Sequence, residues 1–128
     1  MQRSAAIKAA ITGMLFAVTV AVPALAHHGW SWAEEEFSEL TGTVRSVFVG
    51  NPHARIELEV DGEVWTVELA PPAATERAGF TEEAVASGDE ATVVGHRSRD
   101  ANERTFKAVR VIVGDESYDV YPRRLPPA

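Results

Sequence analysis

The stretch HARIELEVDGEVWTVEL, residues 53–69, contains the most regular pattern of the sequence. Residues 53–60 alternate between apolar and charged side chains, which is the pattern of a strand with one buried face. Asp61-Gly62 is a typical two-residue turn between antiparallel strands, and residues 63–69 resume the alternation. The stretch therefore predicts a β-hairpin.

Further short strands are expected on both sides of this hairpin, at residues 40–49, 90–96, 106–113 and 116–121. Pro71-Pro72 ends the hairpin, and Ala73 to Arg77 is predicted to form one helical turn. Five or six short strands with a small helical insertion after the third indicate an all-β fold, a small barrel of OB (oligonucleotide/oligosaccharide-binding) type. A β-sandwich is the competing fold, and the helical insertion favours the barrel because an OB barrel commonly has a helix at that point.

The first 26 residues have the pattern of a secretory signal peptide. Two basic residues precede an apolar stretch at 9–22, and Ala24-Leu25-Ala26 provides the small side chains that signal peptidase accepts. A membrane-spanning anchor is the alternative, but a spanning helix needs about 20 apolar residues, and Pro23 ends this stretch earlier. Cleavage after Ala26 predicts a periplasmic or secreted protein that starts at His27 and keeps no membrane anchor.

Cleavage divides the chain into the signal peptide at 1–26, an N-terminal segment at 27–39, a barrel domain at 40–122 and a C-terminal tail at 123–128. Removal of Arg3 and Lys8 leaves all 19 acidic residues in place, so the net charge falls from −7 to −9. Nucleic-acid binding is not expected because it requires clustered lysine and arginine, whereas metal ions and cationic ligands are favoured electrostatically. The sequence has no cysteine, which excludes disulfides, thiolate metal sites and a lipid anchor on cysteine.

The four histidines suggest a metal site. The processed chain offers the α-amine and the imidazole of His27 to one ion as a chelate, and nitrogen donors of this kind suit copper or zinc. His53 lies at the start of one predicted strand and His96 at the end of another, so both could approach the N-terminal segment in a small barrel. We therefore predict His27 and His53 as metal ligands, with His28 or His96 as a further donor. In the alternative interpretation, the first two histidines are polar residues of a flexible terminus, His53 caps a turn and His96 is a solvated strand end.

The second hypothesis is a non-catalytic interaction domain without a metal, whose partner is a small ligand or an envelope protein. Its candidate ligand-face residues are Trp30, Asn51 and Trp65, although the strand pattern around Trp65 favours a core position for that side chain. The sequence has no nucleophile elbow, phosphate-binding loop or HExxH motif, so no catalytic residue is assigned and an enzyme is not expected. An oxidative copper enzyme is the exception to consider, because it also begins with a histidine amine and imidazole chelate.

Five segments together resemble one known family: AHHGWSWAEEE (26–36), GNPHA (50–54), WTVELAPP (65–72), GDEATVVGHRSRD (88–100) and KAVRVIVGDESYDVYP (107–122). They are similar to the short secreted bacterial proteins of the domain of unknown function 6152. The resemblance covers almost all of the chain after residue 26 and implies an exported β-barrel domain, but it implies no activity. The family-like positions are His27, His28, Trp30, Asn51, Pro52, His53, Trp65, Pro71 and Pro72.

Overall fold

The computed structural model describes residues 29–128, which form β-strands, one short α-helix and a short 3₁₀ helix. In chain order these are β1 (Ser38–Phe48), β2 (Arg55–Val60), β3 (Glu63–Glu68), α1 (Pro72–Arg77), β4 (Glu90–Arg97), β5 (Thr105–Val113), β6 (Glu116–Asp119) and the 3₁₀ helix η1 (Pro122–Arg124). Every predicted strand is present, and its ends lie within about two residues of the expected ones.

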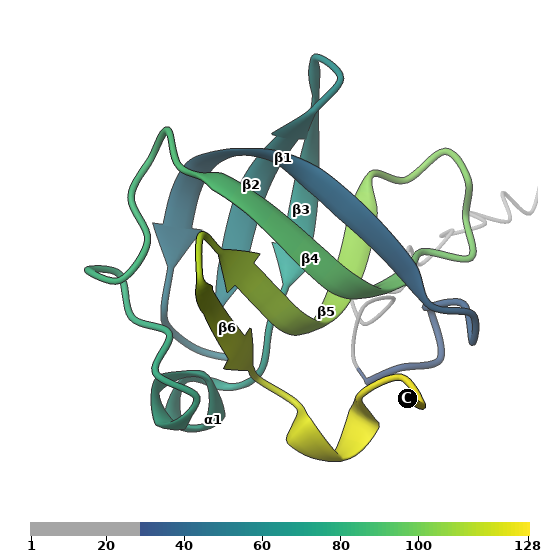
Figure 1. Cartoon of the computed structure of the whole chain (residues 1–128). Helices are drawn as coiled ribbons and strands as arrows, with labels where there is room; N and C mark the ends of the chain where they lie inside the picture. The colour runs from purple at the N-terminus through teal and green to yellow at the C-terminus, as the bar shows by residue number, and fades with distance from the viewer. Residues whose placement is uncertain (1–28) are drawn as a thin grey trace, which may run out of the picture.

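The strands form a closed barrel, seen nearly side-on in Figure 1. Their order is β3-β2-β1-β4-β5-β6, and an additional parallel pairing of β3 with β5 closes the first five strands on themselves. One edge of β5 is divided between two partners, because Thr105 to Lys107 pair with β3 and Arg110 to Val113 pair with β6. The predicted all-β barrel of OB type, with a helix after the third strand, is confirmed, and the strands form one closed sheet instead of the two stacked sheets of a sandwich.

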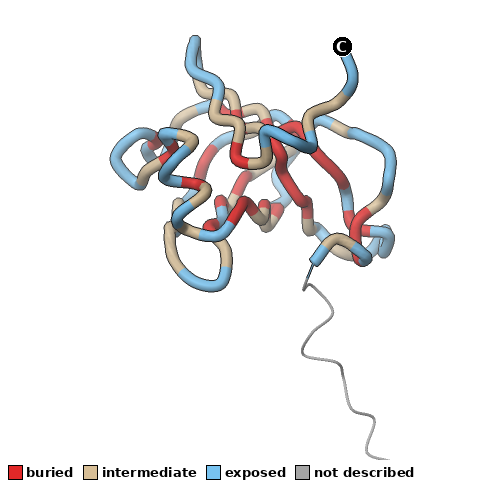
Figure 2. Tube along the Cα trace, turned by 90° about the horizontal axis from the view of Figure 1, so that it is seen from below, coloured by how far each residue is buried: buried red, intermediate tan, exposed pale blue. Residues whose placement is uncertain are grey.

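Inward-facing side chains fill the barrel, and Figure 2 shows the buried stretches along its strands. The hairpin contributes Ile56, Leu58 and Val67, all fully buried, as its alternation predicts. Trp65 follows the same alternation and belongs to the same core cluster, with 9 % of its surface exposed. The register explains this arrangement, because Leu58 pairs with Trp65 and Ile56 pairs with Val67, so that these apolar residues share one face.

The helix α1 begins at Pro72, where the fixed φ of proline suits the first turn and its missing N–H is not needed. The buried Thr75 hydroxyl donates a hydrogen bond of 2.9 Å to the carbonyl of Ala70, which ties the helix to the chain that leaves β3. Gly79, with a φ of +90°, ends the helix, and Phe80 then enters the core. Among residues 29–128, no helix has the length and apolar character needed to cross a bilayer.

Two glycines allow neighbouring strands to approach closely. A Cβ at Gly95 would collide with the backbone carbonyl of Lys107 on β5, and a Cβ at Gly42 would collide with the carbonyl of Glu59 on β2. Gly95 also lies at an irregularity in the pairing of β4 with β5. Because paired backbone atoms cannot move aside as the end of a flexible side chain can, both positions require glycine.

We expect Gly95→Ala to lower the free energy of unfolding by about 1–3 kcal/mol, because the added methyl group overpacks the β4–β5 pair. Urea denaturation followed by tryptophan fluorescence measures the change. Glu90→Ala, at an exposed position of the same strand, is the control and should change the free energy of unfolding by less than about 0.5 kcal/mol. Equal losses in the two variants would contradict the argument from close approach.

Candidate functional site

A row of charged and polar side chains crosses the outer face of the barrel. Arg55 pairs with Glu68 between β2 and β3, Glu68 pairs with Lys107 between β3 and β5, and Lys107 pairs with His96 between β5 and β4. Residues paired in register place their side chains on the same side of a sheet, and the neighbouring Phe106 is in the core, so this row faces outward. Barrel closure therefore makes Glu68, Lys107 and His96 neighbours.

Lys107 is nevertheless buried, with only 1 % of its surface exposed. Its ammonium donates a hydrogen bond of 3.2 Å to the carbonyl of Leu69 and lies 4.0 Å from Oε2 of Glu68. The same ammonium lies 5.2 Å from the ring centre of Trp30 and 5.4 Å from that of Tyr121. Burial lowers the pKa of Lys107 below its ordinary value, and the Glu68 carboxylate acts in the opposite direction. Among the residues that the structure describes, Oε2 of Glu68 is buried without a hydrogen-bond partner.

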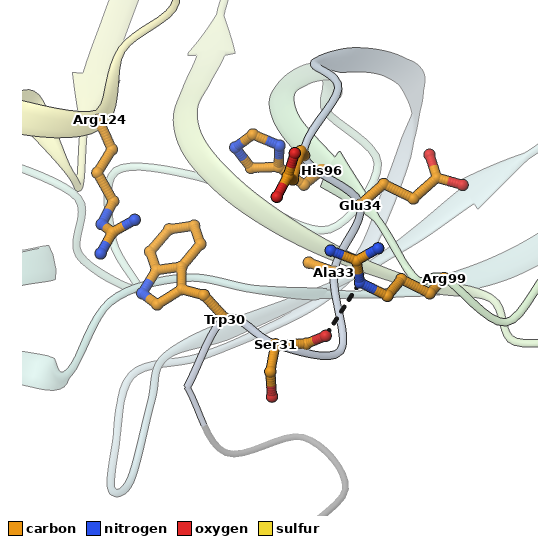
Figure 3. Close-up of a pocket in the computed structure, with 8 residues that line it drawn as sticks. Trp30, Ser31, Ala33, Glu34, His96, Arg99 and Arg124 are labelled. Carbon is orange, nitrogen blue, oxygen red and sulfur yellow. Dashed lines mark hydrogen bonds between the residues drawn. The ribbon is translucent and has the colours of Figure 1, made fainter.

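Trp30 covers this row from the N-terminal segment. Its ring meets Tyr121 edge-on, with ring centres 4.8 Å apart, and the guanidinium of Arg124 lies 4.1 Å from the centre of the Trp30 ring. The ring centre of His96 lies 6.0 Å away. The start of the described chain and the η1 segment after β6 are thus packed against each other over the outer face of β4 and β5. Figure 3 shows Trp30, His96 and Arg124 grouped around this position.

His96 is a buried residue of the site, with 9 % of its surface exposed, so the interpretation of a solvated strand end is wrong. Its Nδ1 lies 3.0 Å from the carbonyl of Glu36, and its ring centre lies 4.4 Å from that of Phe37. A carbonyl oxygen only accepts hydrogen bonds, so Nδ1 carries the proton of this bond. In the neutral ring, Nε2 then keeps its lone pair and can accept a hydrogen bond or bind a metal ion.

A cavity of about 380 Å³ opens beside His96. It is lined by Trp30, Ser31, Ala33, Glu34, Glu35, His96, Arg99 and Arg124. The Arg99 side chain donates a hydrogen bond of 3.0 Å from Nε to the carbonyl of Ser31, drawn as the dashed line in Figure 3. The cavity therefore combines an aromatic wall with both carboxylates and guanidinium groups, a composition that fits a polar or zwitterionic small ligand.

The other predicted site residues lie elsewhere. His27 and His28 fall outside the described residues. Asn51 is exposed in the loop between β1 and β2, and His53 is half-buried at the end of that loop. Trp65 points into the core, with the guanidinium of Arg97 5.2 Å from its ring centre. Within residues 29–128, no group of three or more histidine, aspartate or glutamate side chains is arranged to hold a metal ion.

The sequence pattern did not identify Lys107, Glu68, Tyr121 or Arg124 as site residues. One signal was present: Lys107 stands between Phe106 and Ala108 in a strand that is otherwise mostly apolar. A lysine there must either lie on a solvated face or be covered by another part of the chain with suitable partners. The structure shows the second arrangement, and the covering segments are remote in sequence.

The stability of the protein should rise as the pH is raised toward about pH 10, because of Lys107. The pKa of Lys107 in the folded protein lies below its ordinary value of 10.5. Below pH 10.5 the unfolded chain therefore binds more protons than the folded protein does. Raising the pH removes the proton that burial disfavours, so the free energy of unfolding increases. The raised pKa of Tyr121 has the opposite effect, which becomes important as the pH approaches 10, where an ordinary tyrosine is half ionised.

Urea midpoints measured across this range test the prediction, and Lys107→Met should abolish the rise. Lys107 is the only lysine among residues 29–128, so no other lysine in this region contributes to the difference between the two proteins. A rise that persists in Lys107→Met would assign the effect to another group.

Comparison with known sequences adds one relationship. No curated protein matches this chain. Residues 15–107 match the profile described as Family of unknown function (DUF6152). The matched range includes β1 to β4, the Trp30 segment and the first residues of β5, up to Lys107. Because this match spans most of the sequence, the chain belongs to the family of unknown function DUF6152.

Proposed function

We propose that this protein is an exported, periplasmic binding domain that holds a transition metal, copper or zinc, at its processed N-terminus. The ligands are the α-amine and imidazole of His27 together with His53, and His28 or His96 supplies a further nitrogen. The observation that carries the proposal is the fixed position of Trp30 over the barrel, because this position limits where the preceding histidines can reach.

Chain length supports an approach of the terminal histidines to His96. His27 lies three positions before Trp30, and an extended chain of three Cα-to-Cα steps spans about 10 Å. The Trp30 ring centre lies 6.0 Å from the His96 ring centre. This short separation supports the proposal that a donor of the processed N-terminus binds the same ion as Nε2 of His96.

A short series of contacts also leads from Trp30 to His53. The Trp30 ring lies 5.2 Å from the ammonium of Lys107, which is bonded to the carbonyl of Leu69. The amide of Leu69 donates a hydrogen bond of 2.8 Å to the carbonyl of Ala54, the residue directly after His53. The end of the loop that contains His53 thus lies near the part of the barrel that Trp30 covers.

The chemistry of these groups suits a borderline metal ion. An amine and imidazoles are nitrogen donors, which copper(II) and zinc(II) prefer over the oxygen donors of calcium or magnesium sites. The bond from Nδ1 of His96 to the Glu36 carbonyl is the kind of contact that orients a metal-binding imidazole. The net negative charge of the chain also raises the local concentration of cations.

A small-ligand or protein-interaction module without a metal is the second candidate function. The cavity of about 380 Å³ beside Trp30 and His96 favours it, because its volume is that of a small-ligand site and an aromatic wall is available for stacking. In this alternative, His96 provides a hydrogen bond to the ligand. The two candidates differ in whether the free amine of His27 is required.

Calorimetric titration of Cu(II) and Zn(II) into the chain that begins at His27 tests the metal proposal. We expect one ion to bind per chain. Placing one glycine before His27 should weaken binding by at least about 100-fold, because it separates the α-amine from the imidazole chelate, and His53→Ala should have a comparable effect. Asp115→Asn, in an exposed turn, is a control for unspecific attraction by carboxylates and should leave the affinity unchanged.

Binding that is indifferent to both changes at the ligands would overturn the terminal site, and so would the absence of binding. Either result would favour the alternative function, a small-ligand or protein-interaction module without a metal. Circular dichroism of the three variants confirms that the barrel is intact in each case.

Export and processing are tested by the intact mass of the protein recovered from the periplasm of a bacterial host. We expect the mass of residues 27–128, because Ala24 and Ala26 provide the small side chains next to the cleavage point. Ala24→Glu should block processing, whereas Ala10→Leu, which preserves the apolar stretch, should not. Recovery of the unprocessed chain from the cytoplasm would contradict the proposal of export.

A further inference from the structure

A second cavity, of about 540 Å³, lies between α1 and the segment that contains η1. Arg77 of α1 lines one side, Arg123 and Arg124 of η1 line another, and none of the lining residues is acidic. This composition is unusual for a chain with 19 acidic and 12 basic residues. Three guanidinium groups around one cavity create a positive local potential, so the cavity favours an anion.

The three arginines also lack a carboxylate partner among the described residues. Arg110 shows the contrast, because it forms an ion pair with Asp119 close to this cavity. Both carboxylate oxygens of Asp119 accept hydrogen bonds from Arg110, so Asp119 does not neutralise the cavity. The exposed guanidinium groups of Arg77 and Arg123 can therefore bind an incoming carboxylate through paired N–H···O bonds.

The floor of the cavity is apolar. Val120, with 2 % of its surface exposed, contributes to it together with Tyr121 and Pro122. The edge-on contact between the rings of Tyr121 and Trp30 holds Tyr121 in place beside the cavity. An apolar floor beside guanidinium groups matches a ligand with a hydrocarbon body and one anionic end.

We propose that this cavity binds a small organic anion with an apolar body, of the class of medium-chain carboxylates. The carboxylate pairs with Arg77 and Arg123, and the hydrocarbon part covers Val120 and Pro122. The site uses none of the histidines, so it is independent of the proposed metal site. Because Arg124 lines both cavities, the test leaves Arg124 unchanged.

Octanoate is the probe, and two ligands serve for comparison. 1-Octanol has the hydrocarbon body without the negative charge, and inorganic phosphate has negative charge without the hydrocarbon body. They are titrated by calorimetry into the metal-free protein that begins at His27, and the site is located by the backbone amide resonances. We expect octanoate to bind one-to-one and to shift the amide resonances of residues 74–77, 120–121 and 123–124. The double variant Arg77→Gln/Arg123→Gln should bind octanoate at least about tenfold more weakly, because each arginine supplies charge-assisted hydrogen bonds. Arg45→Gln, on β1, is the matched control and should leave binding unchanged.

Four results would overturn the proposal. Equal affinity for 1-octanol would show that the arginines do not contribute, and equal affinity for phosphate would show that the apolar floor does not. No saturable binding of octanoate, or shifts confined to other residues, would exclude this cavity as the site. Urea denaturation compares the double variant with the wild type, and if the variant is unstable, the position of the shifts in the wild type still decides the result.

Discussion

The short parallel pairing of β3 with β5 is the contact on which the rest of the structure depends. It joins Val67 to Phe106 and Glu68 to Lys107. Without it the sheet would have open edges, and unpaired strand edges are prone to join other chains. The same pairing places Glu68 and His96 on the two sides of Lys107, since β5 also pairs with β4. The candidate site is therefore a product of barrel closure and belongs to no single strand.

Closure of the barrel alone would leave Lys107 facing water. The two ends of the described chain cover this side chain and exclude water from it. Removing an ammonium group from water costs free energy unless new partners replace the solvent. Here the carbonyl of Leu69, the carboxylate of Glu68 and the aromatic faces of Trp30 and Tyr121 replace it. Trp30 precedes β1 and Tyr121 follows β6, so Lys107 favours the one arrangement in which both segments lie over it.

The sequence predicted the barrel because the relevant signals are local. Alternation and a two-residue turn within residues 53–69 specify a hairpin and its buried face, including the core position of Trp65. The burial of Lys107 and His96 depends on segments far away in the chain. The alternative interpretation of the local pattern placed His96 beside Arg97 at a solvated strand end, and no period in the sequence indicates that Trp30 covers it. The fold was therefore accessible to sequence analysis, whereas the covered outer row required the tertiary structure.

The two proposed sites take ligands of opposite charge, and the contact between Trp30 and Arg124 lies between them. The guanidinium of Arg124 is 4.1 Å from the centre of the Trp30 ring and lines both cavities. An aromatic face attracts a cation without neutralising it, because the ring carries a quadrupole and no net charge. A carboxylate in the place of Trp30 would also hold Arg124 but would cancel its charge, which would weaken the attraction of the η1 cavity for an anion. Tryptophan at this position thus fixes the arginine and preserves the positive potential that an anion requires.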